Sequence, residues 1–326
     1  MKYRDIREVK SDCVPPGEKG VVLLVMTWVI ALISVVILGW MEEWRTEIKL
    51  AANYYNQRKC HYLAQGGIYY ALGKLVEAKI VERKRLITAA RTSPNLWRTD
   101  QTPYILEFLE GRVEISMADE GGKLNLNQLP KNILAKFLEG LGFKDHELQS
   151  LLSAIPDRRD AGAVVRPLGV AKNFNLSLLS PFFTSNRKFE TIEELALVHG
   201  LRDTHLLSRL SRWFTVQETG AGVNINTAPR EVLKALGFST KQAEAVILAR
   251  RGKPFESLNE VALTGMVIPL QVKSHITFQT SNFFTITSTG TLKNKSGRHT
   301  IKTLLEFSGR RTLSWKFLYW MDDYPA

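Results

Sequence analysis

An uncharged run of 20 residues, 21–40, constrains this chain more than any other feature. As an α-helix rising about 1.5 Å per residue it would be roughly 30 Å long, which matches the hydrocarbon thickness of a bilayer. A cleaved secretory signal has a shorter apolar core that ends at a small-residue cleavage site. Here the run continues directly into a charged segment, residues 41–47. The sequence therefore predicts a retained, single-pass membrane helix.

The junction in front of this helix is also informative. Residues 1–20 are polar and end in Glu18-Lys19-Gly20, directly before Val21. A glycine there gives a protease at the membrane surface an unhindered, extended backbone. The arrangement resembles the class III signal of type IV pilins and pseudopilins, which is cleaved after the glycine on the cytoplasmic side. The resemblance implies a leader of residues 1–20, processing by a prepilin peptidase and a mature N-terminus at Val21; the alternative is an ordinary membrane anchor.

One departure from the pilin pattern concerns the fifth position after this cleavage point, which is Val25. Pilin-like subunits usually carry Glu there. A carboxylate inside the bilayer costs about 3 kcal/mol unless it is paired, and in these families its partner is taken to be the N-terminal amine of the subunit ahead. A subunit without this Glu needs no subunit ahead. With Val25 in place of this Glu, the chain therefore resembles the minor pseudopilin K family of type II secretion systems, which occupies the tip position.

Further along the chain, the pattern predicts a mixed fold. Apolar residues recur at helical spacing beyond residue 40, and no proline occurs between there and Pro94, so the helix is expected to continue to about Ala90. Residues 104–118 read as a β-hairpin around Glu110-Gly111, and strand patterns return at 283–289, 299–307 and 312–320. We predict an α+β, pilin-like fold, in which the long N-terminal helix packs on an antiparallel sheet interrupted by a large α-helical insertion. The expected divisions are 21–40 (membrane half of the helix), 41–118 (rest of the helix and first hairpin), 119–280 (insertion) and 281–326 (remaining strands).

The insertion contains an internal repeat. The matching strings are Leu124-Asn-Leu-Asn127 with Val223-Asn-Ile-Asn226, Pro130 with Pro229, Leu141-Gly-Phe143 with Leu236-Gly-Phe238, Arg158-Arg159 with Arg250-Arg251, and Phe189-Glu190 with Phe255-Glu256. We interpret Asn127 and Asn226 as caps of the helices that follow them. The two copies resemble the SAM-like, helix-hairpin-helix-type insertion of the K family, whose most recognisable strings are residues 119–127 and 223–229.

The same resemblance associates the region after the first copy with calcium. A calcium site needs about six to eight oxygen ligands. Here Asp157 and Asp160 flank two arginines, and Glu193 or Glu194 are the nearest further candidates. We expect calcium binding to be weak or absent.

Composition adds little to this picture. The formal net charge of +12 suits nucleic acid or anionic lipid, although basic residues that solvate helix faces are the simpler explanation. Cleavage would remove Cys13 and leave Cys60 alone, so the mature chain could form no internal disulfide. No Walker A, Gly-x-Ser-x-Gly or Cys-x-x-Cys motif is present, and the histidines show no metal-ligand spacing. These are His61, His146, His199, His205, His275 and His299. We expect a non-enzyme without a cofactor.

Two functional hypotheses follow. The first is a minor pseudopilin at the tip of a type II secretion pseudopilus, anchored in the inner membrane with its bulk in the periplasm, where it nucleates assembly and supports export. The resemblance implies other minor pseudopilins as partners, and further contacts with the outer-membrane secretin or the exported protein; it implies no nucleic acid. The alternative is a membrane-anchored DNA receptor of the competence type, which would bind phosphate through hairpin amides. Each hairpin here has a single glycine, Gly142 or Gly237, where such modules usually carry Gly-x-Gly.

Overall fold

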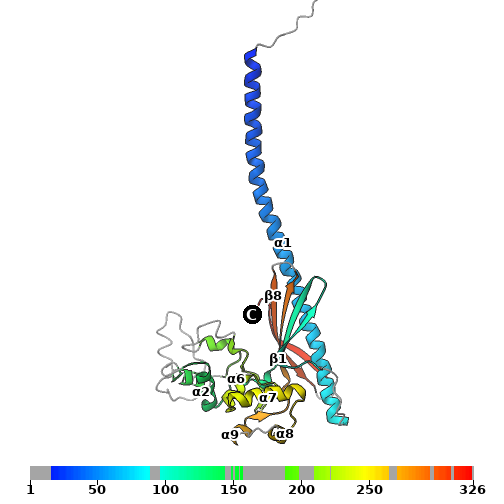
Figure 1. Ribbon diagram of the computed structural model, residues 1–326, viewed down its shortest axis with the longest axis vertical. Coiled ribbons are helices and arrows are strands. Elements are labelled where there is room, and N and C mark those ends of the chain that lie inside the picture. The colour runs from blue at the N-terminus through cyan, green and yellow to red at the C-terminus, as the bar shows by residue number, and fades with distance from the viewer. Residues whose placement is uncertain are drawn as a thin grey trace, which may run out of the picture. The chain divides into compact units, whose positions relative to one another are not determined.

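The computed structural model describes residues 16–88, 96–143, 148–149, 151–153, 155–156, 188–197, 209–220, 222–263, 270–293, 297–309 and 312–324. The chain divides into two compact units, Met1–Arg58 and Lys59–Ala326. Helix α1, Pro16–Thr88, is one unbroken helix of 73 residues that belongs to both units (Figure 1). The predicted continuation of the membrane helix to about residue 90 is confirmed.

In the first unit the apolar surface of α1 has no packing partner among the residues that the structure describes. The large apolar side chains between residues 21 and 44 are 47% to 70% exposed. Its most apolar stretch is long enough to cross a membrane, and none of that stretch is buried. Exposure of so much contiguous apolar surface would be unfavourable in water, so lipid or other protein must cover it.

The second unit contains a five-stranded sheet (Figure 1). Its strands are β1 (Asp100–Glu107), β2 (Gly111–Asp119), β7 (Phe283–Leu292), β8 (Arg298–Ser308) and β9 (Ser314–Met321), in the order β1-β2-β7-β8-β9. All neighbours are antiparallel, and β2 pairs with β7 from Gly111 opposite Leu292 to Asp119 opposite Phe284. The prediction of a single antiparallel sheet interrupted between its second and third strands is therefore confirmed.

The part of α1 that lies in this unit packs on the sheet. Ala64, Ile68, Ala71 and Leu75 recur at helical spacing and are buried in one cluster with side chains of β2, β7 and β8. The two come close together at Gly67, where an added Cβ would lie 2.2 Å from the Ser288 hydroxyl oxygen. A glycine is needed at this crossing because any side chain would push α1 away from the sheet.

The insertion between β2 and β7 has a hydrophobic core of its own. Its helices whose bounds lie within the described residues are η1 (Glu120–Gly122), α2 (Lys131–Gly140), η2 (Glu193–Leu197), α6 (Arg230–Leu236), α7 (Thr240–Gly252), α8 (Leu258–Leu263) and α9 (Leu270–Lys273). Four short strands also occur, and the sequence did not indicate them: β3 (Leu124–Asn125) pairs in parallel with β4 (Phe214–Thr215), and β5 (Val223–Asn224) with β6 (Ile276–Thr277). Each copy of the repeat is thus closed by a parallel pair that joins its start to its end.

Candidate functional site

The second asparagine of each repeat binds backbone rather than capping a helix. The Asn127 side chain donates to the Phe189 carbonyl (2.9 Å) and accepts from the Phe189 N–H (2.8 Å). Asn226 makes the same two bonds with Phe255, each 2.8 Å. The predicted capping role is wrong, because Pro130 and Pro229 stand at the cap positions without a side-chain cap bond. A side-chain amide carries both a donor and an acceptor and so matches a peptide group, which fixes each buried phenylalanine in the insertion core.

Each copy of the repeat also ends in a Thr-x-Gln string, which is absent from the matching strings identified in the sequence above. The Leu126 N–H donates to the Thr215 carbonyl (2.9 Å), and the Ile225 N–H donates to the Thr277 carbonyl (3.0 Å). In both copies the threonine hydroxyl then accepts from the N–H of the glutamine two residues on. The two strings share only the threonine and the glutamine. The match is therefore recognisable only once the copies have been aligned on their asparagines.

Asp119, the last residue of β2, ties the second copy of the repeat to the sheet. It is 2% exposed, and its carboxylate accepts from Asn224 Nδ2 (2.8 Å), Thr227 Oγ1 (3.1 Å), the Gly121 N–H (2.9 Å) and both the N–H (3.1 Å) and Oγ (2.6 Å) of Ser281. Burial of an unpaired carboxylate is costly unless hydrogen bonds satisfy it. This one is satisfied by donors from both ends of the insertion.

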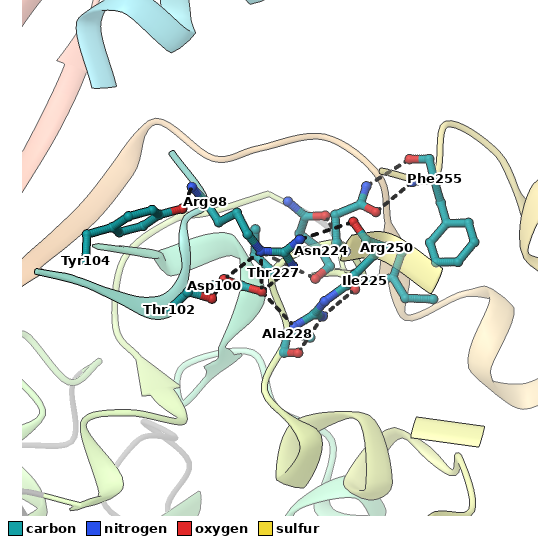
Figure 2. Close-up of polar contacts among 11 residues, drawn as sticks. Arg98, Asp100, Thr102, Tyr104, Asn224, Ile225, Thr227, Ala228, Arg250 and Phe255 are labelled. Carbon is teal, nitrogen blue, oxygen red and sulfur yellow. Dashed lines mark hydrogen bonds and ion pairs between the residues drawn. The ribbon is translucent and has the colours of Figure 1, made fainter. Parts of the chain in front are cut away.

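A second link joins the insertion to β1 through Arg250, at the end of α7. Its side chain is 3% exposed, and Nη1 donates to the carbonyls of Ile225 (2.8 Å) and Ala228 (2.7 Å). Its Nη2 lies 3.5 Å from the Asp100 carboxylate. Figure 2 shows the guanidinium between that carboxylate and the two carbonyls. Burial lowers the pKa of Arg250 to about 10, against the opposing charge of Asp100.

Asp100 itself is also held by two neighbouring side chains, Arg98 and Thr102. Arg98 approaches it with Nε (3.2 Å) and Nη2 (2.5 Å), and the Thr102 hydroxyl donates at 2.6 Å. Burial alone would raise the pKa of Asp100, but these hydrogen bonds and the charges of Arg98 and Arg250 outweigh it and hold the pKa below its ordinary value. The repeat partner of Arg250, Arg158, lies outside the described residues.

A cavity of about 260 Å³ lies between residues of the insertion and residues of the sheet. Its lining includes the buried ion pair of Glu120 and Lys123, and also Lys302. Burial lowers the pKa of Lys302. Glu120 also accepts from Thr285 Oγ1 (2.6 Å), and Lys302 donates to Ser211 Oγ (2.9 Å). These three charged side chains therefore all have hydrogen-bond partners within the protein.

The predicted processing residues all lie on α1 in the first unit. Gly20 is exposed, with nothing within 4 Å of an added Cβ, and Val21 and Val25 are 63% and 53% exposed. The extended backbone expected at Gly20 is wrong for this structure, since α1 already begins at Pro16. The apolar run propagates a helix through the junction, so a peptidase would have to unwind about one turn of it.

The calcium candidates are not brought together among the described residues. Asp157 and Asp160 lie outside them. Glu194 accepts from the backbone N–H groups of Glu190 (3.1 Å) and Thr191 (3.3 Å), while Glu193 is exposed. Weak or absent calcium binding stays a prediction.

The hairpins proposed to bind DNA use their amides internally. Gly237 adopts φ = 115°, its N–H donates to the Lys234 carbonyl (3.0 Å), and the Phe238 N–H donates to Leu233 (3.2 Å). The next N–H, of Ser239, donates to Gln242 Oε1 (2.9 Å). These bonds end one helix and begin the next. They leave no amide at residues 237–239 to hold a phosphate, which argues against the DNA-receptor alternative.

A long N-terminal helix packed on an antiparallel sheet defines the pilin-like class of subunits. Two family models, both described as type II secretion system protein K, match residues 119–219 and 223–272. The type II secretion system protein K of Pseudomonas aeruginosa is 26% identical over 260 residues, which are 75% of this chain and 76% of that protein. These matches support a minor pseudopilin of the type II secretion system, similar to protein K. The matched family is a structural component of that system.

A solved structure agrees at the level of the fold. One chain of the GspK–GspI–GspJ complex from the type 2 secretion system of enterotoxigenic Escherichia coli matches with a TM-score of 0.57 and 18% identity. The match covers 80% of this chain and 97% of that one. The overall mixed fold, with a long N-terminal helix and an antiparallel sheet, is therefore similar to that of a chain in a solved complex.

Proposed function

We propose that the chain is the tip subunit of the pseudopilus, where it nucleates assembly and supports protein export across the outer membrane. The observation that carries this proposal is Val25 within residues 21–40, an exposed apolar stretch that contains no carboxylate at all. Within a bilayer an unpaired carboxylate costs about 3 kcal/mol. A subunit with Glu at this position therefore depends on a neighbour's amine, and this chain does not.

The dependence is asymmetric. After cleavage behind Gly20 the new amine at Val21 still offers a partner to the glutamate of the next subunit. Such a subunit can be followed by others but needs none ahead of it. The insertion supports the same position, because its described residues form a body with its own core between two adjacent strands of the sheet. A body of this size is easier to place at the end of a close-packed filament than inside it.

The membrane arrangement follows from the same helix. We infer that α1 anchors the chain in the inner membrane, with the sheet and insertion in the periplasm, and that a prepilin peptidase cleaves after Gly20. The exposed apolar surface of α1 supports the anchor, and the open surroundings of Gly20 support access by the peptidase.

The partners are inferred from the family. The matched solved structure is a complex of GspK with GspI and GspJ. We infer that this chain forms a tip complex with the corresponding minor pseudopilins, and that contact with the secretin or the exported protein follows from the tip position.

Processing is tested with a pair of glycines on the same helix. Neither Gly20 nor Gly39 has any atom within 4 Å of an added Cβ, so valine at either position leaves the fold intact. The full chain is expressed with and without its prepilin peptidase, and the intact mass is measured. Wild type and Gly39→Val are expected to lose residues 1–20 only with the peptidase, and Gly20→Val is expected to stay uncleaved. A Gly20→Val chain that starts at Val21 would contradict the assigned junction.

The tip position is tested by Val25→Glu, with the other minor pseudopilins copurified on the tagged full chain from membranes. Because no pairing is needed at a tip, the variant is expected to keep most of its partners and to lower secretion mildly. If it abolishes copurification while membrane insertion is unchanged, residue 25 is in contact with another subunit ahead, and the tip assignment is refuted.

A further inference from the structure

Three potential metal ligands converge on the second unit from elements far apart in the sequence. His61 lies on α1, His299 on β8, and Asp322 directly follows β9. His61 Nδ1 is 3.1 Å from His299 Nε2, and Asp322 Oδ1 is 3.6 Å from the first nitrogen and 3.7 Å from the second. The two histidines show no metal-ligand spacing in the sequence because they are 238 residues apart.

These separations are close to those expected around a small transition-metal ion. In tetrahedral zinc sites the metal–ligand bonds are about 2.0 to 2.2 Å long, so neighbouring ligand atoms lie roughly 3.3 to 3.5 Å apart. The three measured separations place a point about 2.0 Å from all three atoms, in the plane that they define. With bonds of about 2.1 Å the ion would lie roughly 0.6 Å out of this plane, close to tetrahedral geometry.

Burial leaves one side of the cluster open. The side chains of His61 and His299 are 19% and 8% exposed, whereas Asp322 is 52% exposed. An ion can therefore enter past the carboxylate, and water can occupy the fourth position. Two neutral imidazoles and one carboxylate form a donor set that zinc accepts.

A hydrogen bond between the two imidazoles would explain their 3.1 Å contact by itself. It would not explain Asp322, whose oxygen is beyond hydrogen-bond distance from both nitrogens yet nearly equidistant from them. A cation bound by all three atoms would account for both the imidazole contact and the position of the carboxylate. One feature limits the affinity: His299 Nδ1 is buried without a hydrogen bond, so this ring lacks the outer partner that strengthens metal-bound imidazoles.

We propose that His61, His299 and Asp322 bind one Zn²⁺ ion. The ion ties the end of β9 to α1 across β8. Strand β9 is an edge of the sheet and pairs with β8 alone, so this link fixes the chain segment that leaves the sheet last. The site is separate from the region that the family resemblance associates with calcium and does not depend on the tip position.

The test uses the full chain in detergent micelles with Co²⁺ as a spectroscopic probe and Zn²⁺ as its competitor. Wild type is expected to take up one equivalent of Co²⁺ with the intense visible bands of tetrahedral coordination, and Zn²⁺ is expected to displace it. His61→Ala and His299→Ala should weaken binding at least about tenfold. His275→Ala removes an imidazole outside the cluster and should leave binding unchanged.

Two adjacent aspartates give a matched pair that does not threaten the fold. Both Asp322 and Asp323 are exposed, and Asp323 has φ = 56°, which asparagine tolerates. Asp322→Asn is expected to weaken Co²⁺ binding about tenfold, and Asp323→Asn to leave it unchanged. The proposal is overturned if wild type takes up no stoichiometric metal. It is equally overturned if Asp322→Asn and both histidine variants, with unchanged near-ultraviolet circular dichroism, bind as wild type does.

Discussion

Replacement of Asp119 by alanine should release the insertion from the sheet. The carboxylate accepts five hydrogen bonds, and two of the donors have other partners: Ser281 Oγ also donates to the Phe283 carbonyl, and Thr227 Oγ1 lies near the Asn224 carbonyl. The other three are the N–H groups of Gly121 and Ser281 and the side-chain amide of Asn224. No other bond is present for these three donors among the described contacts.

The magnitude follows from these three donors. A buried donor left unsatisfied costs about 1 to 3 kcal/mol, and partial access of water to the space left by the side chain reduces the sum. We expect Asp119→Ala to lower the free energy of unfolding by roughly 3 to 5 kcal/mol. Asp119→Asn keeps one acceptor oxygen but turns an NH₂ group toward another donor, so it should cost about 1 to 3 kcal/mol.

The assay is hydrogen exchange on the full chain in detergent, followed at the amides of Gly121 and Ser281, together with denaturant unfolding. The control is Glu114→Ala, which removes an exposed carboxylate from the same strand. In Asp119→Ala both amides should exchange faster while those in the middle of β8 stay protected. Unchanged protection, or a stability within about 0.5 kcal/mol of the Glu114→Ala control, would refute the assigned role of Asp119.

Two further predictions concern the packing of α1 and the acid stability of the second unit. Gly67→Ala gains helix propensity but places its Cβ 2.2 Å from Ser288 Oγ, so it should destabilise the protein by about 1 to 3 kcal/mol. Gly73→Ala meets nothing within 4 Å and should stabilise the protein by up to about 1 kcal/mol. Thermal unfolding that changes stability in the same direction for both variants would contradict the close approach at Gly67. The pKa of Asp100 lies below its ordinary value of 3.8, so its stabilising contribution is present above about pH 4 and is lost as the pH falls through the lower folded-state pKa. Asp100→Asn should accordingly be less stable than wild type at pH 7, and the difference should shrink in acid; a difference that stays constant down to pH 2 would argue against the ion pairs.

The strands were predictable because their alternation and turns are local. The runs at 283–289 and 299–307 lie within β7 and β8, since one face of each strand must be buried on α1. The start of β1 was missed: the pairing is irregular between Asp100 and Pro103, and Gln101 has φ = 67°. Such an irregularity interrupts the alternation on which strand prediction depends.

The contacts that define the junctions were less accessible. The repeated Asn127 and Asn226 were visible as letters, but their partners Phe189 and Phe255 lie 62 and 29 residues away, so a local capping role was the natural inference. The convergence of His61 with His299 depends on how α1 crosses the sheet. Pairings of this kind are set by tertiary packing and leave no periodic signal in the sequence.

The interruption of the sheet between β2 and β7 also affects the order in which the chain can fold. If the intervening segment of roughly 160 residues were unstructured, bringing these two strands together would cost about 3 kcal/mol more in loop-closure entropy than a tight hairpin. The insertion has its own core, and its first and last residues meet at Asp119. Once the insertion has folded, it places the start of β7 next to the end of β2, as a short turn would. Strands β2 and β7 can thus pair as if a short hairpin loop joined them. The rate at which the sheet forms is then limited by the folding of the insertion.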